Sequence, residues 1–460
     1  MKKSKRVLVI VITLIIAAAS IFFLTAQQVP HAALAAQAPG LRGQKFTVAT
    51  WWNNYDVNTY KPRNDGEQKE LDYRKKLLSE NGFDFSSVEL TNFDNYLQVV
   101  SINLTSRNKQ YQIYELAADM AIALQKQGLL YPVSDSKAVN FSNRNESAYE
   151  RPMYNSLVER MMTFGGKQFG WKYGHPNNSW QTAMVFFNAD HLRQAGLSAE
   201  YIYNLQKNNT WTWDALYDLC KKLSRDTDGD GKPDIYALHC DDPREFIRAL
   251  VYSNGGDFVT FNNKGKAQNA ANNAAVTDAL NFYNKLINEN LIMTSPFSEW
   301  EAEWNLFKDQ KISMVFQPEW RKGNSADFKF VYGIALPPKG PRSRHYRIDA
   351  LDSVFVIPAY YSPSEVDAIL KAAELWNTPV DNDWLASHYW SAKNPRDVTE
   401  TVVMSRDPQY LVVRNHAIIP GYPFEDFVNE FRNSLGKANP AQLIKTWTTK
   451  FNIAINNFNK

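Results

Sequence analysis

The sequence predicts an α/β protein with a largely parallel sheet and more than one lobe. From residue 45 onward, runs of β-branched and aromatic residues alternate with segments of helical periodicity. Strands that alternate with helices in this way are typical of layered α/β folds. The chain has 460 residues, which is too many for one ordinary core, so two lobes or domains are expected.

The first elements follow one another after Gly43. A strand is expected over 45–52, which reads KFTVATWW, followed by a helix near 69–80. A second strand over 86–92 leads into a helix over 93–104, and a third strand over 111–117 leads into a helix that Gly128 ends. The strands are assigned from their β-branched and aromatic content, and the helix end from the glycine.

Two later helices carry clear start signals. Thr212 can cap one helix, and Ser362 with Pro363 and Glu365 has the pattern of a capping box. Both segments place apolar residues on one face at helical spacing, which indicates core packing. These residues are Leu216, Leu219, Cys220 and Leu223 in the first helix, and Val366, Ile369, Leu370 and Ala373 in the second.

The stretch DTDGDGKPDIYAL, residues 226–238, is similar to the first two thirds of a calcium-binding loop. Alternating acidic positions turn three carboxylates inward, and Gly231 permits the sharp turn between them. Calcium prefers six to eight oxygen ligands. The expected ligands are Asp226, Asp228, Asp230, the backbone carbonyl of Lys232, and Asp234, which binds directly or through water.

The end of this loop departs from the calcium-binding pattern. Ala237 stands where a bidentate glutamate normally completes the site, so another residue would have to supply that ligand. The alternative is a solvated turn, although the repulsion between close carboxylates favours a bound cation. Because DIYAL is expected to be a strand, we predict a structural Ca²⁺ at a helix–strand junction rather than a sensor site.

Residues 1–35 are a targeting segment. Four basic residues precede an apolar run over 7–24, and Ala33-Leu34-Ala35 offers a cleavage site. The run is long for a signal peptide and about the minimum for a spanning helix, so both a cleaved signal peptide and a retained membrane anchor stay open. In either case the rest of the chain is expected to be extracellular or held at the cell surface.

The net charge argues against nucleic-acid binding, and the two cysteines leave a disulfide open. The net charge is +3, and the four basic residues before the apolar run exceed it, so the exported part is close to neutral. Nucleic-acid binding relies on clustered positive charge and is therefore not expected. Cys220 and Cys240 flank the acidic loop, and whether they form a disulfide is left open.

Several segments resemble, in the same order, those of extracellular solute-binding proteins of bacterial sugar ABC importers, the family that includes maltose-binding-protein-like receptors. One of these segments is TWTWDALYDLCKKLSRDTDGDGKPDIYAL, over 210–238, and the shared order of the segments is what makes the set specific. Looser matches are TVATWW and LFKDQKISMVFQPEW, and the matches together run from about residue 45 to 376. Gln310 replaces the usual glycine, and no lipobox cysteine is present.

This resemblance implies a two-lobed, type II periplasmic-binding-protein-like fold with a hinge of two or three crossing segments. The lobes would be 44–175 plus 352–405, and 176–351 plus 406–460 with the calcium loop. The crossings would lie near 175–180, 349–354 and 403–415. The implied partners are an oligosaccharide and the transmembrane permease subunits of an ABC transporter, and the protein is expected to be monomeric.

Candidate ligand contacts lie at the expected cleft. Successive strand residues face opposite sides, so one of Trp51 and Trp52 should reach the cleft and the other the core. Asp119 follows the third strand, where it either lines the cleft or caps a helix. Indole rings stack on sugar faces and polar groups bind the hydroxyls. The other candidates are Trp180, Trp300, Trp304, Trp320, Arg344 and Tyr346. For the tryptophans, core packing is the alternative.

A set of basic residues bears on the charge of the ligand. If these side chains converge they would bind a uronate, and otherwise they lie on solvated faces. The set is Lys172, Arg321, Lys322, Arg344 and Arg347.

Two other function classes are considered. An exported glycan-cleaving enzyme would need paired carboxylates, for which Glu299 with Glu303 or Asp349 with Asp352 are available. A calcium-dependent adhesion module would usually carry a duplicated loop, and one loop is present. No G-x-S-x-G, H-E-x-x-H or P-loop motif occurs, which gives the enzyme class no further support. The prediction of a non-catalytic sugar receptor follows from the resemblance of the ordered segments to the solute-binding family.

Overall fold

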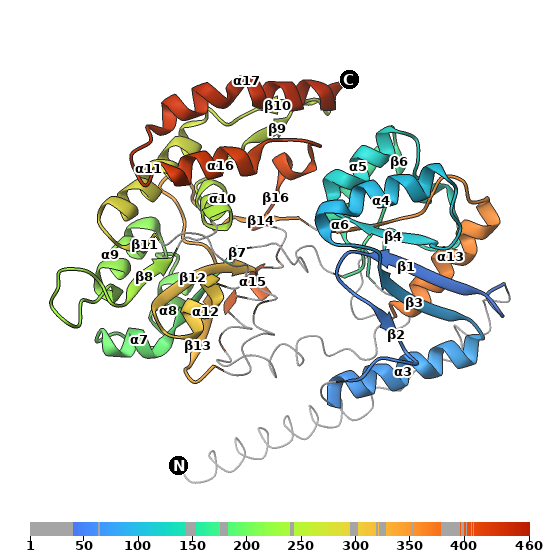
Figure 1. The fold of residues 1–460 in the computed structure, drawn as a ribbon, viewed down its shortest axis with the longest axis horizontal. Helices are drawn as coiled ribbons and strands as arrows, with labels where there is room; N and C mark the ends of the chain where they lie inside the picture. Colours follow the sequence, from blue (N-terminus) through green and yellow to red (C-terminus); the bar gives the residue numbers. More distant parts are fainter. Residues whose placement is uncertain are drawn as a thin grey trace, which may run out of the picture.

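The computed structural model shows two bodies joined by several connections (Figure 1). It describes residues 40–62, 65–143, 153–174, 183–239, 243–294, 302–318, 321, 328–351, 353–378, 396, 400–401, 403–405, 407 and 409–460. The predicted targeting segment 1–35 and the predicted first crossing at 175–180 lie outside these residues. We name the body that contains residues 40–174 lobe 1 and the other lobe 2.

Lobe 1 is built on a five-stranded sheet in the order β15-β4-β1-β3-β2. Strand β1 pairs in parallel with β3 and β4, as predicted, whereas β2 and β15 pair antiparallel at the two edges. The sheet is therefore parallel only in its centre. Its strands are β1 (Lys45–Thr50), β2 (Tyr55–Asp56), β3 (Asp84–Glu89), β4 (Ile113–Leu116) and β15 (Val354–Val356).

Helices cover both faces of this sheet. On one face Phe46 and Val48 pack with side chains of α3 and α13, and on the other Ala49 packs with side chains of α4 and α5. The helices are α3 (Asp65–Asn81), α4 (Phe93–Thr105), α5 (Ala118–Lys126), η1 (Val133–Asp135), α6 (Ser156–Met161) and α13 (Pro363–Trp376). A small hairpin is formed by β5 (Thr163–Phe164) and β6 (Lys167–Gln168).

Lobe 2 has its own five-stranded sheet in the order β11-β8-β12-β7-β13. Strands β11, β8 and β12 are parallel, and β7 lies antiparallel between β12 and β13. The strands are β7 (Ala183–Asn188), β8 (Tyr236–His239), β11 (Ile292–Met293), β12 (Ile312–Pro318) and β13 (Tyr332–Ala335). A separate hairpin is formed by β9 (Val259–Phe261) and β10 (Ala267–Asn269).

The helices of lobe 2 enclose the larger of the cores. This core includes the fully buried Phe186, Phe187 and Trp211. The helices are α7 (Ala189–Gln194), α8 (Tyr201–Lys207), α9 (Trp213–Leu223), α10 (Pro243–Ser253), α11 (Ala274–Asn288), α12 (Ala302–Lys308), α15 (Val403–Ser405), α16 (Phe424–Asn433) and α17 (Pro440–Asn459).

Two short strands connect the lobes. Strand β14 (Ile348–Ala350) pairs in parallel with β16 (Leu411–Val413), and η4 (Asn415–Ile418) follows. Ile348 packs in the core of lobe 2, whereas Ala350 packs in the cluster that lies against β4 and α5. Strand β14 therefore passes from one core to the other, close to the predicted crossing at 349–354.

Residues near 400 contact lobe 2, ahead of the predicted crossing. We expected lobe 1 to extend to residue 405, with a crossing near 403–415. Arg396 already donates to Glu200 of α8 at 2.9 Å, and the Thr401 hydroxyl donates to the Ile334 carbonyl of β13. Thr378 still contacts Arg74 of α3 in lobe 1. The contacts of Arg396 and Thr401 therefore differ from the predicted division, which placed these residues in lobe 1.

Both predicted capping motifs are present. The Thr212 side chain accepts a hydrogen bond from the Ala215 backbone N–H at the start of α9. Ser362 and Glu365 form the complete reciprocal capping box of α13. The predicted apolar stripes of both helices are buried. Cys220 lies in the lobe 2 core as a free thiol in the structure, and its possible partner Cys240 lies outside the described residues.

None of the helices in the described part of the chain combines the length and the apolar character that crossing a bilayer requires.

Candidate functional site

A pocket of about 220 Å³ lies at the carboxyl ends of β1 and β4 in lobe 1. Open α/β sheets generally bind ligands at this edge, because loops and helix N-termini converge there. We call it the carboxyl-edge pocket. Its lining includes aromatic and charged side chains, notably Trp52, Tyr55, Glu115, Lys172 and Trp376.

A compact polar network forms one wall of this pocket. Lys172 Nζ lies 2.5 Å from Glu115 Oε1 and 2.8 Å from Ser353 Oγ, and the Ser353 hydroxyl donates to Glu115 Oε1 at 2.6 Å. The Glu115 side chain is 5% exposed and that of Lys172 is 22% exposed. A charge pair this poorly solvated is held in fixed geometry by its hydrogen bonds, so it presents a preformed polar surface.

Trp52 projects beside this network. It is 59% exposed, and its indole N–H donates to Glu115 Oε2 at 3.2 Å. Glu115 therefore accepts from the indole with one oxygen and from Lys172 and Ser353 with the other. The hydrogen bond fixes the orientation of a large ring whose face remains available to solvent or ligand.

The base of the pocket is aromatic. Trp376, at the end of α13, stacks on Phe85 with ring centroids 5.0 Å apart and contacts Tyr55 at 5.7 Å. Burial, together with the nearby Glu70 carboxylate, raises the pKa of Tyr55 to about 12, so its hydroxyl stays protonated. The Arg74 guanidinium donates to the Trp376 and Thr378 carbonyls and thereby fixes the end of α13.

The predictions for lobe 1 are partly matched by these positions. Trp51 packs edge-on against Tyr96 and Phe93, with ring centroids 5.4 and 5.6 Å apart, so it is the core-facing member of the Trp51–Trp52 pair. Asp119 lies in the first turn of α5 and is not its N-cap, which is Ala117. Burial raises the pKa of the Asp119 carboxyl, and the Glu425 carboxylate of lobe 2 adds to this effect.

Lobe 2 carries a second polar cluster at the edge of its own sheet. Gln317, near the end of β12, donates to Glu303 Oε2 at 2.6 Å. His239, at the end of β8, places Nδ1 3.4 Å from Glu303 Oε1. All three side chains are buried. The cluster lies at the carboxyl ends of β8 and β12, where a closing lobe would meet a ligand.

Several predicted ligand contacts in lobe 2 are core residues instead. Trp304 is 3% exposed and packs against Phe186 and Phe328, with ring centroids 5.2 and 5.0 Å apart. Tyr346 is also 3% exposed, and its hydroxyl donates to the Gln206 carbonyl. Arg344 is exposed and lines a different cavity. Trp180, Trp300 and Trp320 lie outside the described residues.

The basic residues considered for a uronate site lie in three separate places. Lys172 belongs to the carboxyl-edge pocket, the Arg321 guanidinium lies over the ring of Trp304, and Arg344 and Arg347 line a cavity near β16. Lys322 is outside the described residues. The described members of this set therefore do not gather in one site, although Arg344 and Arg347 share a cavity, and the uronate alternative gains no support from them.

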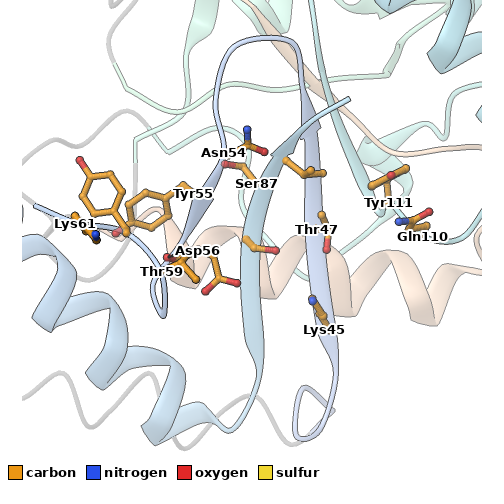
Figure 2. A pocket seen from close by; sticks show the side chains of 13 residues that line it. Lys45, Thr47, Asn54, Tyr55, Asp56, Thr59, Lys61, Ser87, Gln110 and Tyr111 are labelled. Atoms are coloured by element: carbon orange, nitrogen blue, oxygen red, sulfur yellow. Dashed lines mark hydrogen bonds between the residues drawn. The ribbon is translucent and has the colours of Figure 1, made fainter. Parts of the chain in front are cut away.

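A larger concavity of about 780 Å³ opens on another part of lobe 1. Figure 2 shows its side chains, which come from β1, β2, β3 and the segments that flank β2 and precede β4, and they include Lys45, Thr47, Asp56 and Tyr111. Most of them are polar. It shares Tyr55 and Ser87 with the carboxyl-edge pocket, but it extends along β1 toward Lys45, at the amino end of that strand. We therefore place the candidate site at the carboxyl edge.

The acidic loop connects α9 to β8, as predicted. The carboxylate oxygens of Asp226, Asp228 and Asp234 lie within 4.8 Å of one another, and all three residues are exposed. Hydrogen bonds from the Gly231 and Gly229 backbone N–H groups lower the pKa of Asp226. The Thr227 hydroxyl and N–H lower that of Asp234.

The other two predicted loop ligands are Asp230 and the carbonyl of Lys232. Asp230 is not part of the group of three carboxylates, and its side chain accepts from the Lys232 backbone N–H at 2.8 Å. A carbonyl ligand from Lys232 stays a prediction. The three gathered carboxylates are oxygen donors of the type that Ca²⁺ prefers.

The carboxylate pairs considered for an enzyme are not assembled among the described residues. Asp349 is 1% exposed and accepts from Arg414 Nε at 2.7 Å, so it is a buried ion-pair partner at the hinge. Glu303 is hydrogen-bonded to Gln317. Glu299 and Asp352, the other member of each pair, lie outside the described residues.

Comparisons with known structures identify the fold. A protein that binds cyclic α-maltosyl-1,6-maltose, from Arthrobacter globiformis, has a TM-score of 0.62 at 18% identity, covering 90% of this chain and 99% of its own. An ABC substrate-binding protein from Listeria monocytogenes, in complex with cycloalternan, has a TM-score of 0.61 at 16% identity, with coverage of 90% and 99%. UgpB from Mycobacterium tuberculosis, in complex with glycerophosphocholine, has a TM-score of 0.61 at 13% identity, with coverage of 89% and 98%.

At such identities these structures show the two-lobed binding-protein fold and do not by themselves give a ligand. No curated protein sequence matches the chain. The family model for bacterial extracellular solute-binding proteins matches residues 86–376, which is well over half of the chain and spans parts of both lobes. The chain is therefore a member of the bacterial extracellular solute-binding protein family.

Proposed function

We propose that this protein is a carbohydrate receptor that captures an oligosaccharide and delivers it, unaltered, to the permease of an ABC importer. The observation that carries the proposal is the carboxyl-edge pocket. There an exposed indole, Trp52, is oriented by a carboxylate that is itself fixed by Lys172 and Ser353.

The chemistry of this pocket suits a sugar. Pyranose rings have apolar C–H faces that stack on aromatic rings, and their hydroxyls pair with carboxylates, ammonium groups and hydroxyls. Trp52 and Trp376 supply rings, and Glu115, Lys172 and Ser353 supply the polar partners. The same groups suit a neutral polyhydroxylated ligand better than a lipid or a nucleotide, because acid and base are already paired with each other.

Capture would proceed by closure of the two lobes. A ligand that touches both the carboxyl-edge pocket and the edge of lobe 2 stabilises the closed state by its contacts with both. The described groups on lobe 2 that lie at this edge are Gln317 and Glu303. The closed form would then dock on the permease. Release, rather than bond cleavage, would end the cycle.

Two of the similar structures support the choice of carbohydrate, because their ligands are described as cyclic maltose-derived sugars and cycloalternan. The third was solved with glycerophosphocholine, which shows that the fold also accepts other polar solutes. The proposal of a carbohydrate ligand for this chain therefore rests on the carboxyl-edge pocket, and the experiment compares oligosaccharides with glycerophosphocholine.

The test is isothermal titration calorimetry of the purified full-length protein with a panel of oligosaccharides and with glycerophosphocholine. Each sugar is also analysed for cleavage products after incubation with the protein. We expect saturable binding of at least one oligosaccharide and no cleavage products. Binding of glycerophosphocholine in place of every sugar would overturn the ligand class. Steady release of cleaved sugar would overturn the receptor role.

We further propose that the receptor acts as a monomer at the cell exterior, cleaved or tethered through residues 1–35. We also propose that the acidic loop holds one structural Ca²⁺ through Asp226, Asp228 and Asp234. This assignment is supported by the gathering of their carboxylates within 4.8 Å at the junction of α9 and β8.

A further inference from the structure

A cavity of about 460 Å³ lies in lobe 2, beside the hinge strand β16 and the start of α11. It shares no lining residue with the carboxyl-edge pocket. Its walls come from the end of α10, the N-terminal end of α11, the segment 342–347 and strand β16. No aspartate or glutamate is among the described residues that line it.

Positive charge is concentrated on one wall of this cavity. The short segment 342–347 contributes Arg342, Arg344, His345 and Arg347 to the lining. Arg342 Nε is paired with Asp278 Oδ2 at 2.5 Å. Within the described part of the chain, Arg344 and Arg347 form no ion pair, and the buried Nε of Arg347 has no hydrogen-bond partner. Two guanidinium groups with unfilled donors therefore share one concave space.

The backbone around these arginines is held in place. Asn254 at the end of α10 accepts from the Arg342 backbone N–H at 2.9 Å and donates to the Ala275 carbonyl of α11 at 3.0 Å. A Cβ on Gly340 would meet Asn254 Oδ1 at 2.3 Å, so the turn lies directly against this asparagine. The Arg-rich segment and the first turn of α11 are therefore joined through one side chain.

The first turn of α11 adds to the positive potential. Its N-cap is Asn273, and it contains no acidic residue. Because the N-terminus of a helix carries partial positive charge, the lack of a carboxylate there leaves that charge uncompensated by the helix itself. The two arginines are the main positive groups of the cavity, and the partial charge at the N-terminus of α11 has the same sign.

We propose that this cavity, which we call the hinge-side basic cavity, binds an oxyanion group of the phosphate or sulfate type. Guanidinium groups bind such anions through paired, charge-assisted hydrogen bonds, and Arg344 and Arg347 are the groups with donors to offer. At about 30 Å³ per water molecule, the cavity holds roughly fifteen waters. It therefore has room for a free anion or for a phosphoryl group on a small organic molecule.

The site differs from the proposed sugar site in position and in chemistry. The carboxyl-edge pocket has its lysine paired with a glutamate, whereas two of the three arginines of the hinge-side basic cavity, Arg344 and Arg347, have no acidic partner among the described residues. It also touches the connection between the lobes, because Arg347 directly precedes β14, and Leu411 and Val412 belong to β16. Anion binding is therefore separable from sugar binding in an experiment.

The test measures binding of inorganic phosphate, inorganic sulfate and glycerol phosphate to the purified full-length protein by calorimetry and thermal shift. Chloride at matched ionic strength and neutral glycerol serve as reference solutes. The variant is Arg344→Gln with Arg347→Gln. The matched control removes two exposed cations elsewhere in lobe 2, Lys264→Gln with Lys437→Gln.

We expect a saturable rise in melting temperature with phosphate or sulfate that chloride does not reproduce. The arginine variant should lose affinity by at least about tenfold, because two charge-assisted contacts are removed, while the control keeps it. Tighter binding of glycerol phosphate than of inorganic phosphate would identify a phosphoryl group on a small molecule as the ligand. Equal anion responses in both variants, or no response beyond that of chloride, would overturn the proposal. Unchanged sugar binding in the arginine variant serves as the check that it is folded.

Discussion

Trp52 exposes 59% of its surface, although it is one of the largest apolar side chains in the chain. Its indole N–H is fixed by Glu115, so the ring does not need a ligand to be oriented. An oriented ring loses little conformational freedom on binding, and more of the contact energy then appears as affinity. This residue is where we expect the strongest single effect on sugar binding.

Replacement of Trp52 by alanine should weaken oligosaccharide binding by about tenfold, which corresponds to about 1.4 kcal/mol. Because the side chain is mostly exposed, the free energy of unfolding should change by less than about 0.5 kcal/mol. Calorimetry and urea unfolding measure the two effects. Ile453→Ala, at a position that is 56% exposed on α17, is the control. Unchanged affinity in Trp52→Ala would remove this ring from the site.

Asp257 is a buried acid near the hinge. Its carboxylate accepts from the Tyr252 hydroxyl at 3.1 Å and from the Asn415 amide at 2.8 Å. Burial raises its pKa to about 7, although these hydrogen bonds and the Val259 N–H oppose the shift. The folded state thus holds this proton more tightly than the unfolded state does, for which the value is near 3.9.

Asp257 should therefore make the protein less stable as the pH rises through about 7. The stabilisation from its bound proton is fully present below about pH 4 and is lost as the pH rises through about 7, where the folded group ionises. The free energy of unfolding falls by about 4 kcal/mol in total. Unfolding free energies measured between pH 5 and pH 8 should fall less steeply in Asp257→Asn than in the wild type. The exposed Asp309→Asn is the control. If the free energy of unfolding falls equally with pH in the wild type, Asp257→Asn and Asp309→Asn, the raised pKa of Asp257 is contradicted.

The candidate site could be predicted only in part, and individual residues show why. Trp52 was foreseen because a strand alternates its faces, but the same alternation cannot say which member of the pair points outward. Trp304 was assigned to the ligand on its type and spacing, and these are the same for a core residue. Glu115 and Trp376 were missed. A glutamate within the apolar strand IYEL was a usable signal, because a charge there requires a partner.

At the scale of elements, the acidic loop is the clearest case of local sequence that determines local geometry. Aspartates alternate, glycines occupy left-handed conformations at Gly229 (φ 82°) and Gly231 (φ 84°), and the side chains accept hydrogen bonds from backbone N–H groups within the loop. The turn brings three carboxylates together, and hydrogen bonds from groups of the same loop stabilise two of them, Asp226 and Asp234, in the ionised form.

If the acidic loop holds the proposed Ca²⁺, a chelator should lower the melting temperature, because an ion that binds the folded loop and not the unfolded chain stabilises the folded state. Sugar affinity at low temperature should change little, because the loop lies between α9 and β8, outside the lining of the carboxyl-edge pocket. Thermal unfolding with and without added Ca²⁺ measures this. Asp226→Asn with Asp228→Asn should abolish the difference, whereas Asp218→Asn on α9 should retain it. An identical melting temperature with chelator and with Ca²⁺ in the wild type would show that no such ion contributes.

Element boundaries show where local patterns are insufficient. The capping motifs fixed the starts of α9 and α13 because they are formed by neighbours in sequence. Strand β3 was expected over 86–92 and lies at Asp84–Glu89, since its limits depend on pairing with β1 rather than on its own residues. The antiparallel edges β2 and β15 were likewise not foreseen, because direction is a property of the partner strand.

At the scale of the whole molecule, the two lobes are joined where β14 and β16 lie side by side. Asp349 on β14 and Arg414 after β16 form a buried ion pair, which ties the two connections together. Rotation about a short paired segment is a common way for two-domain proteins to close. The sequence order of the family segments predicted such a connection, with crossings near 349–354 and 403–415, and β14 and β16 lie at or within these ranges.

Closure on a ligand should make the protein more compact. We expect the radius of gyration, measured by small-angle X-ray scattering, to decrease when a bound oligosaccharide identified in the titration is added to saturation. Trp52→Ala should require a higher sugar concentration for the same decrease. A radius that does not change at saturation would show that binding occurs without movement of the lobes.

The edge strand β15 and the helix α13 complete lobe 1, yet they follow the whole sheet of lobe 2 in the chain. A nascent polypeptide therefore cannot finish its first half until most of its second half has been synthesised. Such long-range pairing slows folding and prolongs the lifetime of partly folded, aggregation-prone intermediates. For a chain that must cross a membrane before it folds, such a delay would keep it unfolded for longer. The interleaved layout thus makes the completion of lobe 1 a late step of folding.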